Sequence, residues 1–213
     1  RGPRIRAGTS GRRESFARAA FRFNCPPACE RRACPLRATH DGSPVLFERP
    51  RVGDIEQLRS DLLKREETIH VTDLGAGSQR ANTPERKVRY IARTALKPRA
   101  QAQMIFRLAR YFKPRTVLEL GTSLGITTLY LTRAAWDAAV HTIEGSTAIA
   151  AIAQENFARL NATNIIPHVG NVHDRLPEVL GGIDRLDLVF IDGHHAKAPT
   201  LENFELCLTK AHN

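Results

Sequence analysis

Short apolar runs alternate with amphipathic segments along the second half of the chain. The apolar runs have the length of buried strands and lie at residues 116–120, 140–143, 165–169 and 186–191. The segments between and after them carry apolar residues at helical spacing, at 124–135, 147–160, 172–180 and 200–211. Strand–helix alternation at this spacing predicts βαβ units with right-handed crossovers. We therefore expect an α/β fold, built as a Rossmann-like, doubly wound parallel sheet.

The segment ahead of this alternation has a mainly helical pattern. Apolar residues recur at helical spacing over 52–66, 88–95 and 100–111, with one short strand-like run at 69–74. We therefore divide the chain into a basic segment over 1–51, a helical lead-in over 52–112 and the Rossmann-like domain over 113–213.

Positive charge is concentrated in the basic segment. The whole chain has a formal net charge of +10. Residues 1–51 hold 12 Arg and 4 acidic residues, a net of +8, whereas residues 52–213 hold 20 basic and 18 acidic residues, a net of +2. The basic segment also has many prolines and little periodicity, so we expect it to be mostly disordered. A nucleic-acid partner is consistent with this charge but is not favoured, because the rest of the chain is nearly neutral.

The cysteines and the apolar runs limit the class of protein to which the chain can belong. Cys25, Cys29, Cys34 and His40 supply four ligands of the kind that zinc prefers, but their spacing fits no common zinc finger. We interpret them as incidental thiols and expect Cys207, on an apolar helix face, to be buried. Few cysteines and no export signal favour the cytoplasm. No apolar run approaches the roughly 18 residues that cross a bilayer, so we expect no membrane-spanning segment.

A glycine-rich turn joins the first strand of the alternation to its helix. The sequence reads Glu119-Leu-Gly121-Thr122-Ser123-Leu-Gly125 and then opens the helix. Gly121 permits a tight turn, and Gly125 permits close approach of the backbone to a ligand and to the strand. The free N–H groups of a helix start attract carboxylate or phosphate, so we expect a binding site here.

Polar residues follow the other three strands in the same way. Glu144 follows the second strand, where a carboxylate can accept hydrogen bonds from both hydroxyls of a ribose. Asn171 follows the third, where its amide can pair with an adenine edge. Asp192 and His194 follow the fourth, in Phe190-Ile191-Asp192-Gly193-His194-His195. The carboxyl ends of parallel strands share one edge of a sheet, so we expect these residues to gather there.

In order and spacing, these residues resemble the class I S-adenosylmethionine-dependent methyltransferases. The fourth strand and its end look most like the small-molecule O-methyltransferase branch, in which the pattern FIDG-x-H is typical. The resemblance covers about residues 85–211. It implies that the amino-acid part of S-adenosylmethionine lies near Gly121, Thr122 and Ser123, the ribose on Glu144 and the adenine near Asn171.

The resemblance also implies a function and a reaction centre. It predicts methyl transfer to an oxygen or nitrogen of a small-molecule acceptor, with Asp192 and His194 as catalytic residues. It leaves a Mg²⁺ ion at Asp192 open, as well as a homo-oligomer. Glu119 and Gly125 belong to the cofactor motif. A complete sheet of this family has seven strands, whereas four are predicted here, so we expect the fold to be incomplete at the C-terminus.

Three alternatives remain on the sequence alone. An NAD-type oxidoreductase would need G-x-G-x-x-G, whereas three residues separate Gly121 from Gly125. A nucleic-acid-binding or RNA-methylating protein would use the Arg-rich segment 1–51. A second glycine turn, at residues 73–78, is followed by polar residues and lacks a helix start, so we prefer the turn at Gly121 as the cofactor site.

Overall fold

The centre of the protein is a parallel four-stranded β-sheet. The computed structural model describes residues 52–72, 83–193 and 196–211. The sheet order is β5-β4-β3-β6. Its strands are β3 (Thr116–Leu120), β4 (Ala139–Glu144), β5 (Ile165–Val169) and β6 (Leu188–Ile191). Leu120 is in register with Ile143 of β4 and with Ile191 of β6, so the carboxyl ends of the three strands are level.

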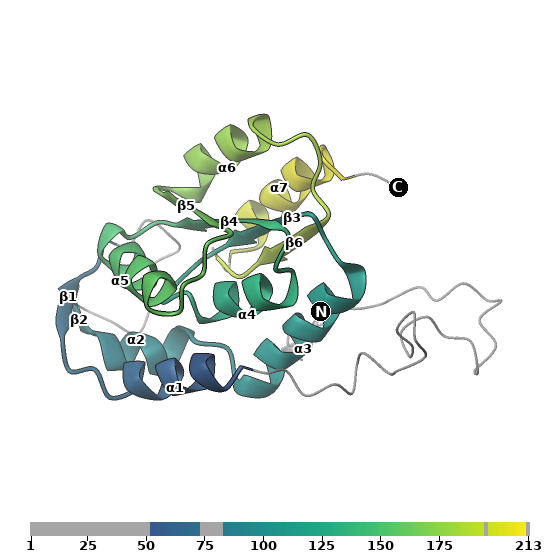
Figure 1. Ribbon diagram of the computed structural model, residues 1–213. Helices are drawn as coiled ribbons and strands as arrows, with labels where there is room; N and C mark the ends of the chain where they lie inside the picture. The colour runs from purple at the N-terminus through teal and green to yellow at the C-terminus, as the bar shows by residue number, and fades with distance from the viewer. Residues whose placement is uncertain (1–51, 73–82, 194–195, 212–213) are drawn as a thin grey trace, which may run out of the picture. The chain divides into compact units, whose positions relative to one another are not determined.

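Helices cover both faces of this sheet, which confirms the predicted doubly wound α/β fold. In Figure 1, α4 (Ile126–Ala134) and α5 (Thr147–Arg159) lie below the sheet, with α3 (Arg99–Phe112) beside α4. On the opposite face lie α6 (Val172–Gly181) and α7 (Lys197–Leu208). These helices, of nine to fourteen residues, match the predicted segments to within a few residues at each end.

The lead-in contains one element that the sequence pattern did not predict. It consists of α1 (Gly53–Leu62), β1 (Thr68–His70), β2 (Glu85–Lys87) and α2 (Val88–Ala95). β1 and β2 pair antiparallel as a separate two-stranded ribbon. Strand β2 consists of Glu, Arg and Lys, and its side chains are mostly exposed. β2 is a strand because its backbone pairs with β1 at the surface, and a strand with exposed side chains needs no apolar residues. The sequence of β2 therefore shows no apolar run.

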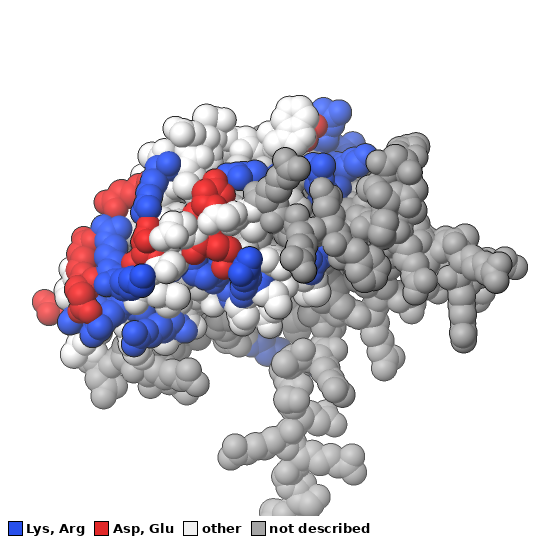
Figure 2. Space-filling view, turned by 60° about the horizontal axis from the view of Figure 1, so that its bottom comes forward, with Lys and Arg blue, Asp and Glu red and all other residues white. Residues whose placement is uncertain are grey.

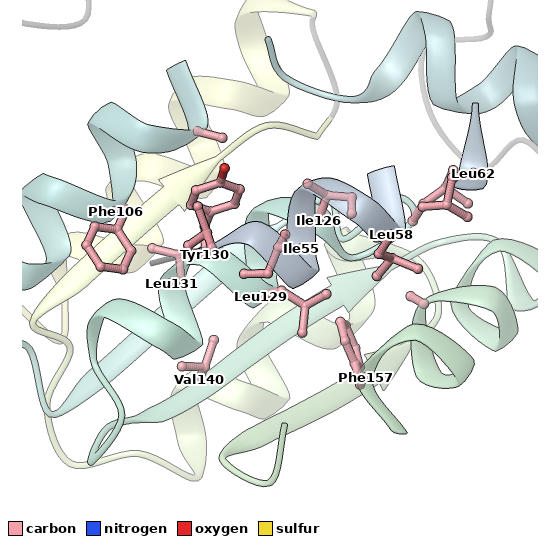
Figure 3. Packing of buried hydrophobic residues seen from close by; sticks show 14 of the residues in the cluster. Ile55, Leu58, Leu62, Phe106, Ile126, Leu129, Tyr130, Leu131, Val140 and Phe157 are labelled. Atoms are coloured by element: carbon pink, nitrogen blue, oxygen red, sulfur yellow. The ribbon is translucent and has the colours of Figure 1, made fainter. Parts of the chain in front are cut away.

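The lead-in helices share one hydrophobic core with the sheet-covering helices. Ile55, Leu58 and Leu62 of α1 are fully buried or nearly so. Figure 3 shows their side chains packed among residues of α3, α4 and α5. Within this cluster Phe106 meets Tyr130 edge-on, with ring centroids 6.5 Å apart. Burial of each large apolar side chain stabilises the folded state by roughly 1.5–3 kcal/mol. The three buried side chains of α1 therefore hold this helix firmly against the shared core.

Ion pairs between elements supplement this core at the surface. Arg133 of α4 pairs with Asp54 of α1 at 2.7 Å, and Arg65 pairs with Glu155 of α5 at 3.0 Å. Figure 2 shows Lys and Arg side chains lying next to Asp and Glu over this part of the molecule. Such exposed pairs contribute about 0–1 kcal/mol each. The mixed charge of this face agrees with the near-neutral balance of residues 52–213.

A second, smaller cluster lies between the sheet and the helices α6 and α7. It includes Leu118, Ile143, Leu176 and Cys207. Cys207 is a free, buried cysteine, as predicted, and burial raises the pKa of its thiol to about 11.

Among the described residues, no helix has both the length and the apolar character needed to cross a membrane. Segment 1–51, with Cys25, Cys29, Cys34 and His40, and the turn at 73–78 lie outside the fully described residues.

Candidate functional site: the carboxyl ends of the strands

The glycine-rich turn after β3 is built from backbone that L-residues rarely adopt. Gly121 has φ +97°, Ser123 +49° and Gly125 +79°. The N–H groups of Gly121 and Thr122 both donate to the carbonyl of Ile143, at 2.9 and 3.2 Å, and so fasten the turn to β4. A Cβ on Gly121 would lie 2.9 Å from the nitrogen of Gly193. The ends of β3 and β6 therefore touch main chain to main chain at this point.

Gly125 serves packing between helices. A Cβ at this position would lie 2.4 Å from the ring of Phe157, on α5. Gly125 itself is buried and is the N-cap of α4. The sequence pattern predicts close approach of Gly125 to a ligand and to the strand, and the structure places the ring of Phe157 against it. Its contribution to the turn is therefore to let α4 start directly against α5.

Glu144 brings the end of β4 to the glycine-rich turn. Its Oε2 accepts a hydrogen bond from the N–H of Ser123 at 2.8 Å, and its Oε1 accepts one from the N–H of Ser146 at 3.0 Å. The side chain is only partly buried, as are Gly121 and Ser123. The predicted neighbours Glu144 and Ser123 are thus in direct contact, and an accessible carboxylate stands beside the turn.

Glu119 lies beneath the turn and is fully buried. Its Oε2 accepts hydrogen bonds from the hydroxyls of Thr128, at 2.5 Å, and Thr142, at 2.7 Å. Removal from water raises the pKa of Glu119 to about 8, although the two hydroxyls act in the opposite direction. The negative charges of Asp192 and Glu144 raise it further. Glu119 therefore carries a proton at neutral pH and forms the uncharged floor of the site.

Thr122 is turned toward the interior. Its side chain is 5% exposed, and its hydroxyl lies 2.6 Å from that of Thr142.

Asn171 is the N-cap of α6, and its Oδ1 accepts a hydrogen bond from the N–H of His173 at 3.0 Å. This cap uses the side-chain oxygen of Asn171. Of the predicted cofactor residues, Gly121, Ser123 and Glu144 present partly exposed groups next to one another, whereas Glu119, Thr122 and Gly125 support them from below.

Asp192, after β6, forms an ion pair that the sequence analysis missed. The Nζ of Lys97 lies 2.5 Å from Oδ1 of Asp192, and both side chains are largely withdrawn from solvent. Lys97 lies between α2 and α3, about a hundred residues earlier in the chain. A lysine next to Pro98 in a basic stretch carries no sequence signal for such a role. His194, the other predicted catalytic residue, lies outside the described residues.

The residues around Asp192 do not fit the Mg²⁺ ion that the sequence analysis left open. Magnesium sites in proteins use one or two carboxylates together with water and substrate oxygens. Here an ammonium group already lies against Oδ1 of Asp192. Among the residues described by the structure, no three His, Cys, Asp or Glu side chains form a group that could hold a metal. Asp192 is therefore better described as the partner of Lys97 than as a metal ligand.

The loop that carries Lys97 is itself fixed by the lead-in. Arg59 of α1 donates from Nη1 to the carbonyl of Lys97 at 2.7 Å. The Nε of Arg59 also bonds to Glu56 at 3.1 Å, and Glu56 accepts the hydroxyl of Tyr130 at 2.7 Å. Burial and the neighbouring Glu56 carboxylate raise the pKa of Tyr130. This network connects α1 and α4 to the loop beside the candidate site.

Comparison with known proteins agrees with this geometry. Residues 118–213 match a family model described as a methyltransferase domain. Over these residues the chain is therefore similar to methyltransferases, in agreement with the resemblance of its motifs. The matched segment begins inside β3 and includes Glu119, Glu144, Asn171 and Asp192.

A catechol O-methyltransferase from Niastella koreensis is 32% identical over 111 residues, which cover 51% of this chain and 49% of that protein. Two solved structures are also similar to the chain. One is the O-methyltransferase TomG of Streptomyces achromogenes, in complex with S-adenosylmethionine, at 30% identity and a TM-score of 0.50, covering 55% of this chain and 53% of that one. The other, described as an O-methyltransferase of Klebsiella pneumoniae, shows 25% identity and a TM-score of 0.51, covering 56% and 54%. The chain thus spans about half the length of these relatives.

Proposed function

We propose that this chain transfers a methyl group from S-adenosylmethionine to an oxygen of a small-molecule acceptor. The observation that carries the proposal is the contact between the Glu144 carboxylate and the N–H of Ser123. It sets an accessible acid at the end of β4 directly beside a glycine-rich turn at the end of β3. A nucleoside whose ribose bonds to the acid would have its next substituent at the turn.

The roles of the turn residues follow from their exposure. Gly121 and Ser123 are partly exposed and would face the amino-acid part of the cofactor, whereas Thr122 and Gly125 are buried and hold the turn in place. The start of α4 adds free N–H groups that attract a carboxylate. Asn171 stands at the end of the next strand, β5, where its amide nitrogen would donate to the adenine while its oxygen caps α6.

The methyl group passes directly from the cofactor to the acceptor, so the protein takes little covalent part in the reaction. The acceptor oxygen attacks the sulfonium methyl carbon in line with the bond that breaks, and the electron pair of that bond stays on sulfur, giving S-adenosylhomocysteine. The protein's main tasks are to align the two reactants and to exclude water. We favour oxygen over nitrogen because the similar proteins are O-methyltransferases.

Calorimetry with S-adenosylhomocysteine tests the proposal on the full chain. We expect binding by the wild-type chain, and an increase in Kd of roughly tenfold or more in Glu144→Gln, because hydrogen bonds to a charged acceptor contribute about 1.5–3 kcal/mol. Glu155→Gln is the matched control, since Glu155 lies on α5 and pairs with Arg65 at the surface. If the folded wild-type chain does not bind S-adenosylhomocysteine, the proposal fails. If Glu144→Gln binds S-adenosylhomocysteine as tightly as the wild-type chain does, Glu144 does not bind the ribose.

A further inference from the structure

The Lys97–Asp192 pair lies next to the place proposed for the cofactor. Asp192 directly follows β6, and its carbonyl oxygen would be 3.1 Å from a Cβ on Gly121. Its N–H donates to the carbonyl of Leu120 at 2.8 Å, which fixes the residue against the end of β3. A positive charge on Lys97 is therefore held at the edge of the glycine-rich turn, where a methyl acceptor would approach the cofactor.

Lys97 is held there by the backbone as well as by Asp192. Only three residues separate α2 from α3, and Pro98 is the N-cap of α3. Arg59 fixes the carbonyl of Lys97 from α1. An ammonium group has three N–H donors, and the ion pair with Asp192 needs one of them. The remaining donors are available to an oxygen of a bound molecule.

We propose that Lys97 holds the acceptor oxygen during methyl transfer and supplies the positive charge that a divalent ion would otherwise supply at Asp192. This inference rests on the proposed function. Asp192 acts as a positioning residue, because it orients the ammonium group of Lys97. The site then takes an acceptor whose oxygen carries or develops negative charge, and it works without a metal ion.

The chemistry of this step balances without a further reactant. The acceptor hydroxyl loses its proton to solvent water, and the resulting oxyanion is stabilised by the ammonium group of Lys97. The oxyanion forms the new oxygen–carbon bond as the sulfur–carbon bond breaks, and sulfur keeps the electron pair. An opposite charge within about 4–6 Å lowers the pKa of an acid by roughly 1–3 units. The Asp192 carboxylate against the same ammonium group acts in the opposite direction, so we expect a shift in the pKa of the bound acceptor at the lower end of this range.

A coloured phenol gives a readout that does not depend on turnover. We expect 4-nitrophenol, added to the full chain with S-adenosylhomocysteine, to ionise at a pH roughly 1 unit or more below its pKa in water, as seen in its visible absorbance. The shift should be lost in Lys97→Met, largely kept in Lys97→Arg, and unchanged by EDTA or MgCl₂. Lys87→Met is the matched control, because Lys87 forms a surface pair with Glu66.

Each other outcome counts against the proposal. A wild-type chain that binds S-adenosylhomocysteine but does not shift the ionisation of 4-nitrophenol overturns the role of Lys97 and leaves the proposed function standing. The same holds if Lys97→Met retains the shift, or if EDTA abolishes it and MgCl₂ restores it. Absence of S-adenosylhomocysteine binding by the folded wild-type chain overturns both proposals, so calorimetry is performed first.

Discussion

The guanidinium group of Arg59 donates a hydrogen bond to the main-chain carbonyl of Lys97 across 2.7 Å. Arg59 lies on the first helix of the lead-in, and Lys97 faces the carboxyl end of β6. Because Arg59 is 12% exposed at its side chain and also pairs with Glu56, it is a fixed link between the lead-in core and the candidate site.

Loss of this link should destabilise the protein. We expect Arg59→Met to lower the free energy of unfolding by about 2–4 kcal/mol, since the Lys97 carbonyl and the partly buried Glu56 both lose a partner. Urea denaturation measures the change. Arg110→Met on the exposed face of α3 is the control and should stay within about 0.5 kcal/mol of wild type. Equal stability of the two variants would show that the link carries no stabilising role.

The contact between Gly125 and Phe157 gives a second prediction. Gly125→Ala should destabilise by about 2–4 kcal/mol, because the added Cβ meets the Phe157 ring and the backbone has a positive φ. Gly181→Ala should instead stabilise by about 0.5–1 kcal/mol, because Gly181 lies in α6 with open space at its Cβ.

Thermal or urea unfolding of the double variant Gly125→Ala/Phe157→Leu separates the two causes. Recovery of part of the loss would identify the ring contact, whereas no recovery would assign the whole cost to the backbone conformation at Gly125.

Glu119 should make stability depend on pH. Its pKa in the folded chain is raised to about 8 from 4.5, so the folded state holds the proton more tightly than the unfolded state does. The stability that this difference contributes is present below pH 4.5 and is lost as the pH rises to about 8, at up to roughly 1.4 kcal/mol per pH unit.

Glu119→Gln tests this effect, because an amide of the same shape cannot ionise. We expect the stability of Glu119→Gln to improve relative to wild type as the pH rises from 5 to 8.5 in urea titrations. The matched variant Glu155→Gln changes an exposed acid on α5 that pairs with Arg65. A constant difference between Glu119→Gln and wild type across this pH range would contradict the raised pKa.

A pair of histidines acts in the opposite direction. His141 on β4 and His168 on β5 stack with ring planes 8° apart, and Nδ1 of His141 lies 3.1 Å from Nε2 of His168. Burial lowers the pKa of both, and each ring's charge would oppose the other's at His141. Arg175 on α6 lowers the pKa of His168 further, while Glu178 raises it.

The folded state therefore resists protonation of this pair where the unfolded state accepts it. Stability contributed by the neutral pair is present above the unfolded pKa of about 6.5 and is lost as the pH falls below it. We expect His168→Gln to lose less stability than wild type between pH 7 and pH 5, with His173→Gln on the exposed turn of α6 as the control. Parallel pH profiles for all three proteins would contradict this role.

The sequence predicted the sheet, and it predicted candidate site residues at the strand ends, because both depend on local patterns. The four strands appear as apolar runs, and the residues that follow them, such as Glu144 and Asp192, can be found by position alone. In contrast, β2 lacks an apolar pattern, since its charged residues pair only through the backbone at the surface.

Contacts between distant segments were the part that the pattern could not supply. Lys97 meets Asp192 only because α2 and α3 pack beside the sheet, and nothing local to Lys97 indicates that partner. Gly125 was singled out from its motif, but its neighbour Phe157 lies on another helix, so no local pattern identifies what Gly125 contacts. The burial of Glu119 likewise depends on Thr128 and Thr142 closing over it.

The origin of Lys97 in the lead-in has a consequence for how such a protein can be altered. The sheet contributes Glu144 and the glycine-rich turn, whereas the segment before it contributes the group proposed to hold the acceptor. On the two proposals above, a chimera that keeps residues 113–213 and receives the lead-in of a related protein is expected to keep the cofactor site and to exchange the lysine that holds the acceptor. The proposed cofactor site and the proposed acceptor-holding group would then come from separate stretches of the chain, which meet at Asp192.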